Sequence, residues 1–274
     1  AGLYGPMKDL RTYGLSLTST TGLDSLVGYK GGDPIPVENA FSDPYAGILG
    51  AFAVLAALNH RRNTGFGQHI DFSQQEAVMQ MVGPAYMDYA LNGRSGGPKS
   101  NEHPLAAMAP HGVFRCKGDD RWISIVVGSD DEWHKLLAAL NHPEWFTVSE
   151  FATREQRLAH IDTLHALIGE WTAQFDDREL AALLQSRGVA ATPVLNVGDL
   201  LDDPHYQSRK TFIQVEHPLG FKETIYGSYV KLSRSEIDVR PGPMIGQNND
   251  YVFRELLGLS EERYRQLIER QVIY

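Results

Sequence analysis

The stretch FSDPYAGILGAFAVLAALNHRRNTGFGQHID, residues 41–71, carries the strongest structural signals in this sequence. Asp43 suits the N-cap of a helix, Pro44 suits the first helical position, and Gly65 follows a basic end at residues 60–62. Together these signals predict a helix of about 18 residues that begins at Asp43. Because apolar residues leave it hardly any polar face, we expect this helix to be buried nearly all round.

Asp43 has two interpretations. Aspartate is a preferred N-cap in helices of every kind, where it contributes ~1 kcal/mol of stability. The same position surrounds a carboxylate with free backbone N–H groups at the positive end of the helix dipole. There it can act as a nucleophile towards a thioester, and the N–H groups can stabilise the developing oxyanion. The spacing alone favours the structural interpretation.

Hydrophobic patterns and turn residues predict further helices and strands on both sides of this stretch. The polar and glycine-rich segment 92–101 separates the elements before it from those after it. The expected elements are strands at 69–72, 112–115, 122–127, 191–197 and 225–231, and helices at 13–26, 74–91, 131–140, 154–171, 177–186, 250–257 and 260–270. We expect Asp176 and Ser260 to cap two of these helices.

The composition is that of an ordinary folded protein and excludes several partners. The chain has 274 residues, a net charge of −9 and a pI near 5.6, so it offers no basic surface for nucleic acid. The apolar run 48–58 is too short to span a membrane. The single cysteine, Cys116, is expected to be buried and inert, and it fits a reducing compartment such as the cytoplasm. Histidine spacing predicts no metal site.

Several motifs in order give the sequence a family resemblance that covers essentially the whole chain. They are Phe41 to Gly47, Leu55 to Arg61, Thr64 to Asp71, Gly5-Pro6, Ala109 to Phe114 with Asp120 to Ile123, Gly188 to Val194, and Gly242 to Asn249 with Leu256 to Ser260. This set resembles class III CoA-transferases of the crotonobetainyl-CoA:carnitine and formyl-CoA transferase type. Since the sequence begins at Ala1, inside one of these motifs, we expect an N-terminal part of the family's chain to be missing.

The resemblance implies a fold and an assembly. The fold is α/β, with an incomplete Rossmann-like large domain and a smaller α+β domain. Residues 1–92 would belong to the large domain, residues 100–198 would form the small one, and residues 199–274 would return to complete the large domain. The family also implies an interlocked homodimer, or a heteromer in which another chain supplies the N-terminal part.

The resemblance also implies a reaction. Asp43 would take the place of the family's nucleophilic aspartate and attack an acyl-CoA to form a mixed anhydride. CoA thiolate would then form an aspartyl-CoA thioester, and a second carboxylic acid would collect the CoA. Coenzyme A thus enters and leaves as part of the substrates, and no metal takes part.

The remaining site residues follow from the same resemblance. Leu3 and Tyr4 would touch the pantetheine side of CoA, and Gln74 would line the site. The stretch 100–108 corresponds to the glycine-rich loop of formyl-CoA transferases but is not glycine-rich. That difference favours either an acid larger than formate or oxalate, such as a succinate derivative, or a different closing arrangement of the loop. We expect Asn101 and His103 to contact the acid.

Two alternatives stay open. An α-methylacyl-CoA racemase of the same fold would share Asp43, but its catalytic histidine would fall near Tyr13, and no histidine lies between Ala1 and Asp43. Because a phenol ionises only near pH 10, tyrosine is poorly suited to that proton transfer. The chain could also be a non-catalytic subunit or a fragment of a heteromeric CoA-transferase.

Overall fold

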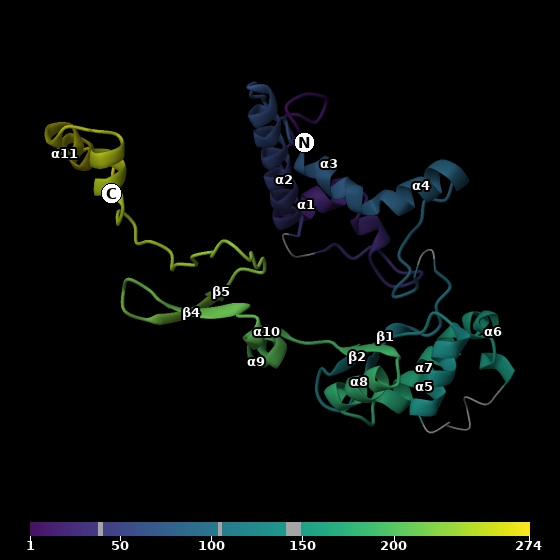
Figure 1. Ribbon diagram of the computed structural model, residues 1–274. Helices are drawn as coiled ribbons and strands as arrows, with labels where there is room; N and C mark the ends of the chain where they lie inside the picture. The colour runs from purple at the N-terminus through teal and green to yellow at the C-terminus, as the bar shows by residue number, and fades with distance from the viewer. Residues whose placement is uncertain (38–40, 104–105, 141–148) are drawn as a thin grey trace. The chain divides into compact units, whose positions relative to one another are not determined.

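The computed structural model describes residues 1–37, 41–103, 106–140 and 149–274. These residues form two compact units, Ala1–Val194 and Leu195–Tyr274, and Figure 1 labels most of their helices and strands. We describe each unit by itself.

The first unit begins with a helical layer. Its elements are α1 (Gly14–Thr20), the 3-10 turn η1 (Asp24–Leu26), α2 (Ser42–Thr64), α3 (Gln74–Met79), the 3-10 turn η2 (Gln80–Val82) and α4 (Gly83–Asn92). The prediction of one helix over 74–91 is wrong in detail, because it is interrupted at η2. Pro44 is tolerated in the first turn of α2, whereas Pro84 has no N–H to bond the carbonyl four residues earlier, which ends the regular helix before it.

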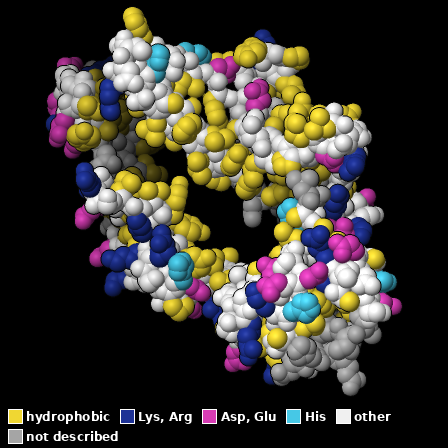
Figure 2. All heavy atoms as spheres, turned by 45° about the vertical axis from the view of Figure 1, so that its right-hand side comes forward, with side chains coloured by type: hydrophobic (Ala, Val, Ile, Leu, Met, Phe, Trp, Pro, Cys, Tyr) yellow, Lys and Arg dark blue, Asp and Glu magenta, His cyan; other side chains and the backbone are white. Residues whose placement is uncertain are grey.

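Helix α2 differs from its prediction in burial. It spans 23 residues and ends at Gly65, whose φ of 80° gives the expected left-handed cap. Only Ser42 and Ala46 are buried, whereas Phe52 is 70% and Leu55 65% exposed. The expectation of a buried helix is therefore wrong for the described residues, because α1 and α3 cover α2 only in part. Figure 2 shows apolar side chains at the surface across the face in view.

The expected strand at 69–72 is also absent from the described structure. Residues 66–73 belong to no helix or strand, and the described strands pair elsewhere, in one three-stranded and one two-stranded sheet. A strand exists only with a partner, and the sequence pattern does not show whether one is present.

The rest of the first unit is an antiparallel sheet packed on helices. The strands β1 (His111–Arg115), β2 (Trp122–Val126) and β3 (Ala190–Pro193) lie in the order β1-β2-β3, which confirms the predicted hairpin. Val113 faces Ser124, and Ile125 faces Ala191. The helical elements are α5 (Asp130–Ala139), η4 (Ser149–Phe151), α6 (Arg154–Ala159), α7 (Ile161–Thr172) and α8 (Asp177–Ser186).

This sheet and its helices hold the hydrophobic core. Ile123 and Ile125 are fully buried and pack with Trp133, Leu164 and Leu184. All members of the core cluster lie between Ala109 and Ala191, inside the segment 100–198 predicted as the small domain. Sheet-to-helix packing of this kind gives the mixed architecture that the sequence predicted.

Arg157 is a fully buried charge in this core. It donates hydrogen bonds to the carbonyls of Ala109 (3.0 Å) and Phe151 (3.2 Å) and to the Asp130 carboxylate (2.7 Å). Its guanidinium also lies 4.8 Å from the centre of the Trp133 ring. Arg157 therefore ties the chain at Ala109, just before β1, to the helices behind the sheet.

The second unit contains a hairpin and short helices. Its elements are α9 (Val197–Asp202), α10 (Pro204–Ser208), β4 (Phe212–Glu216), β5 (Lys222–Tyr226), the π-helix η5 (Asp250–Leu256) and α11 (Glu261–Glu269). Ser260 caps α11 as predicted, accepting the Arg263 N–H at 3.3 Å. The expected strand at 225–231 is displaced, since β5 ends at Tyr226. The return of residues 199–274 to a large domain stays a prediction.

Among the residues that the structure describes, no helix is both long and apolar enough to cross a membrane.

Candidate active site

The candidate nucleophile Asp43 lies in the first turn of α2. The helix begins at Ser42 with Phe41 as its N-cap, so Asp43 is the second helical residue rather than the cap itself. Phe41 has helical backbone angles, and its carbonyl accepts the Tyr45 N–H at 3.4 Å, which moves the start of the helix upstream. The carboxylate still sits in the turn whose backbone N–H groups have no acceptor within the helix.

Gln74 holds this carboxylate directly. Its Nε2 lies 2.5 Å from Asp43 Oδ1, although the two residues are 31 positions apart in the sequence. Gln74 is the first residue of α3, which Ser73 caps by accepting the Glu76 N–H at 3.2 Å. The packing of α3 on α2 thus places an amide donor on one oxygen of Asp43, and among the described residues no hydrogen bond holds the other oxygen.

The N-terminal segment lies beside the start of α3. The Leu3 N–H donates to both oxygens of Asp71, at 3.2 and 3.3 Å, and Asp71 precedes Gln74 by three residues. A Cβ at Gly2 would lie 3.7 Å from Ser73 Cβ. Leu3 and Tyr4, the two residues predicted to contact CoA, are 67% and 83% exposed.

Ser42 is a residue of this site that the sequence did not reveal. Its hydroxyl is fully buried next to Asp43 and has no hydrogen-bond partner among the described residues. A buried hydroxyl without a partner is uncommon and calls for a functional or structural explanation. A serine beside the aspartate was visible in the sequence, but only its burial distinguishes it from a surface serine.

Asn101 and His103 fall in a second cluster, formed with histidines of β1 and α7. The Asn101 carbonyl contacts Nδ1 of His111, and the rings of His103 and His111 meet edge-on at 5.8 Å. The His111 N–H points to His165 Nε2 at 3.4 Å. Burial lowers the pKa of His165, which keeps its ring neutral near pH 7.

The loop before β1 is fastened to an earlier part of the chain. Lys30 Nζ pairs with Glu102 at 2.5 Å, and the Lys30 N–H donates to Ser100 Oγ at 2.9 Å. Among the described residues, no hydrogen bond or ion pair joins this cluster to Asp43 or Gln74. The structure therefore groups the predicted site residues into two sets rather than one.

Comparison with known proteins identifies the family. The model of the family described as "CoA-transferase family III" matches residues 2–249. The chain belongs to this family. A solved structure of a CAIB/BAIF family protein from Brucella suis matches with a TM-score of 0.81 and 27% identity, covering 93% of this chain and 65% of that one. The predicted family and the mixed α/β class are confirmed.

Curated relatives of this family III chain include named enzymes. A probable CoA-transferase of Mycobacterium tuberculosis, Rv1866, is 32% identical over 85% of this chain and 29% of its own length. Formyl-CoA:oxalate CoA-transferase of Rhodopseudomonas palustris is 27% identical over 96% of this chain and 66% of its own. The succinyl-CoA–L-malate CoA-transferase beta subunit of Chloroflexus aurantiacus is 28% identical over 99% and 67%. This family III chain thus spans between 29% and 67% of the length of these relatives.

The described residues of this family III chain contain no group of three His, Cys, Asp or Glu side chains able to hold a metal ion.

Proposed function

We propose that the protein transfers coenzyme A from an acyl-CoA to a carboxylic acid, with Asp43 as the covalent carrier. Membership of CoA-transferase family III supports the reaction class. The contact between Gln74 Nε2 and Asp43 Oδ1 carries the assignment of the nucleophile, because it fixes the carboxylate in the first turn of α2 with one oxygen held and one available.

The reaction proceeds by two exchanges at carbonyl carbons. The free oxygen of Asp43 attacks the thioester carbon, the C–S bond breaks, and CoA leaves as a thiolate. Asp43 and the acyl group are then joined as a mixed anhydride. The thiolate then attacks the Asp43 carbonyl carbon, releasing the first acid as a carboxylate and leaving an aspartyl-CoA thioester. A second carboxylate repeats these steps in reverse order, which restores Asp43 and yields the new acyl-CoA. No proton or electron is gained or lost overall.

Gln74 has a defined task in this sequence. Its amide N–H bonds the oxygen of Asp43 that becomes the carbonyl oxygen of the anhydride and of the thioester. When a nucleophile attacks that carbonyl, negative charge develops on the same oxygen, and a donor already in place stabilises it. The N–H groups at the start of α2 assist as part of the positive end of the helix dipole.

For the substrates, we propose succinyl-CoA as donor and a four- or five-carbon dicarboxylic acid as acceptor. Relatives named as succinyl-CoA transferases act with L-malate, mesaconate or D-citramalate according to their names, and relatives named for formyl-CoA and oxalate also match. The loop around Asn101 and His103 lacks the glycine-rich composition of the formyl-CoA type, which favours the larger acids. Leu3, Tyr4 and Gln74 would face the CoA.

The assembly is part of the proposal. Exposed apolar side chains on α2, including Phe52 and Leu55, would be covered in an interlocked homodimer or by a companion chain. Size-exclusion chromatography with light scattering tests this directly: a dimer or a stable heteromer supports it, and a monomer that turns over substrate contradicts it.

The decisive experiment is to trap the covalent intermediate. The protein is incubated with succinyl-CoA and then with hydroxylamine, and the hydroxamate is located by peptide mass spectrometry. We expect modification at Asp43 in the wild type and none in Asp43→Ala. Asp131→Ala is the matched control, since Asp131 is an exposed aspartate in the first turn of α5 and should not affect trapping.

Two results would contradict the proposal. Hydroxamate at another residue would show that this residue, and not Asp43, is the nucleophile. Exchange of the α-proton of an acyl-CoA with deuterated water, without any adduct, would indicate the racemase instead. The residue at the position expected for the racemase histidine is Tyr13, which is 91% exposed.

A further inference from the structure

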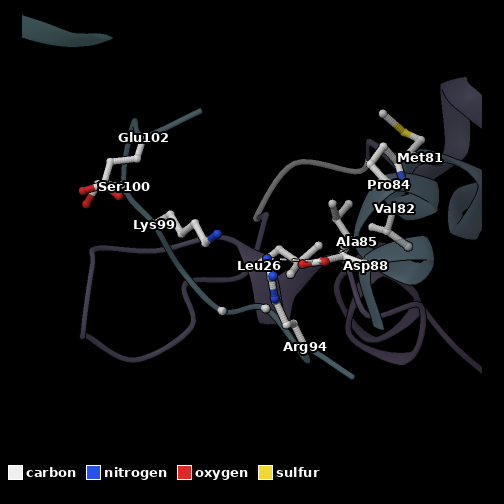
Figure 3. Close-up of a pocket in the computed structure, with 13 residues that line it drawn as sticks. Leu26, Met81, Val82, Pro84, Ala85, Asp88, Arg94, Lys99, Ser100 and Glu102 are labelled. Atoms are coloured by element: carbon white, nitrogen blue, oxygen red, sulfur yellow. Dashed lines mark ion pairs between the residues drawn. The ribbon is translucent and has the colours of Figure 1, made fainter. Parts of the chain in front are cut away.

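A cavity separate from Asp43 lies between η1, α4 and the linker that follows α4. It measures about 320 Å³, and neither Asp43 nor Gln74 lines it. Figure 3 shows its lining side chains. This volume is at the lower end of the range typical of small-molecule sites. At ~30 Å³ for each water-sized group it accommodates roughly ten of them.

The walls of this cavity are mainly apolar. Leu23 and Leu26 of the η1 region line one side, and Met81, Val82, Pro84 and Ala85 line the other. Such walls favour an aliphatic or aromatic body, because moving each methylene from water into apolar surroundings strengthens binding about fourfold.

One side of the cavity carries positive charge. Arg94 pairs loosely with Asp88, at 3.8 Å, and is largely exposed. The Lys99 side chain is directed toward this pair in Figure 3. In the part of the chain that the structure describes, no carboxylate lies within ion-pair distance of Lys99, and the other lining carboxylate, Glu102, is held by Lys30 at 2.5 Å. Among the described residues that line this cavity, the ammonium of Lys99 is thus the charge without a counter-ion.

The cavity is held in shape by close backbone contacts. A Cβ at Gly96 would lie 3.0 Å from Leu26 Cδ2, and Gly96 has a φ of +75°, so only glycine lets the linker approach this closely. Beyond it, the Ser100 N–H donates to the Gly28 carbonyl at 3.1 Å. These contacts close one side of the cavity over Leu26, as expected of a preformed site.

We propose that this cavity binds a monocarboxylate with an apolar body of about eight carbons, such as a medium-chain fatty acid. The carboxylate of the ligand would lie against Lys99 and Arg94, and its alkyl chain would lie between Leu26 and Ala85. The inference does not depend on the transfer reaction, since the cavity and Asp43 are lined by different residues.

Isothermal titration calorimetry with sodium octanoate at low salt tests the proposal. We expect one saturable site per chain. Because each methylene changes affinity about fourfold, hexanoate should bind about fifteenfold more weakly. Octanamide, which has the same length but no charge, should bind about three- to fivefold more weakly than octanoate.

Matched variants separate this site from others. Ala85→Leu should abolish binding by filling the cavity, whereas Ala90→Leu, an exposed position on the same helix, should leave it unchanged. Lys99→Met should weaken octanoate about three- to fivefold without affecting octanamide. Lys222→Met in the second unit removes one positive charge elsewhere and should have no effect.

Asp43→Ala distinguishes this proposal from the proposed function, because the variant should lose covalent trapping and keep octanoate binding. Absence of saturable binding would overturn the proposal, as would equal affinities for octanoate and hexanoate. Loss of binding in Asp43→Ala would also overturn it, since the acid would then occupy the transferase site. Circular dichroism of Ala85→Leu checks folding, and Lys99→Met tests the proposal if that variant does not fold.

Discussion

Replacement of Gln74 by leucine is the sharpest test of the proposed active site. The substitution keeps a similar volume at the start of α3 but removes the donor 2.5 Å from Asp43 Oδ1. Loss of one donor to a developing oxyanion typically costs about 10²–10³-fold in rate, or ~3–4 kcal/mol of transition-state stabilisation. We therefore expect Gln74→Leu to form the aspartyl-CoA thioester about 10²-fold or more slowly, because that step puts negative charge on the Asp43 oxygen that Gln74 contacts.

The effect on stability should be small. Asp43 is exposed and Gln74 is half-buried, so the hydrogen bond adds at most about 1 kcal/mol to the free energy of unfolding. Kinetics and stability should thus separate: a large loss in rate with a nearly unchanged urea midpoint. A purely structural role for Gln74 would show the reverse.

The assay is a rapid-quench experiment with succinyl-CoA in excess, in which the fraction of chain carrying the adduct is followed by intact mass. Asn92→Ala is the matched control, because the Asn92 amide also donates to a carboxylate, Asp88, at 2.7 Å, but away from Asp43. A rate for Gln74→Leu within threefold of the wild type would refute the proposed role of Gln74. An equal loss in Asn92→Ala would show that the effect is not specific to the site.

Three further predictions concern the core and its titrating groups. Arg157→Met should lower the free energy of unfolding by about 3–5 kcal/mol in urea titrations, because it leaves the buried carbonyls of Ala109 and Phe151 without their donor. A loss below about 1 kcal/mol would contradict this account. Burial lowers the pKa of His165, so the unfolded chain binds a proton at this ring more readily than the folded one, and stability should fall as the pH drops below about 6.5. In thermal melts between pH 7 and 5, His165→Phe should lessen that fall. An unchanged dependence of melting temperature on pH in this variant would contradict the prediction. Burial raises the pKa of the Cys116 thiol to about 11, so a disulfide reagent should not modify this thiol in the native protein at pH 8. The same reagent should modify it in urea. Fast labelling of the native protein would contradict the prediction.

Local signals predicted the features that depend on neighbouring residues. The hairpin of β1 and β2 requires a turn between two short runs that contain β-branched and aromatic residues, and the caps at Asp176 and Ser260 require only a side-chain oxygen near the next backbone N–H groups. Gly65 ends α2 for an equally local reason, its left-handed φ. These features are confirmed because nothing distant enters into them.

The predictions that failed depended on contacts with other elements. The apolar pattern of α2 indicated what the helix would bury but could not indicate whether α1 and α3 are large enough to cover it. The segment 69–72 has strand composition, but it pairs with none of the strands that the structure describes. In both cases the stabilising free energy would come from contact with a second element, a covering helix or a neighbouring strand, and the periodicity of one segment does not show whether that element is present.

The candidate sites divide in the same way. The sequence by itself determined the family, through ordered motifs, and with it the choice of Asp43 and Gln74. Only the tertiary structure showed that these two touch, that Ser42 is buried beside them, and that Lys30, His111 and His165 gather around the loop of Asn101 and His103. The octanoate-sized cavity was likewise invisible, because its walls come from residues some 60 positions apart that meet only when the linker closes over Leu26.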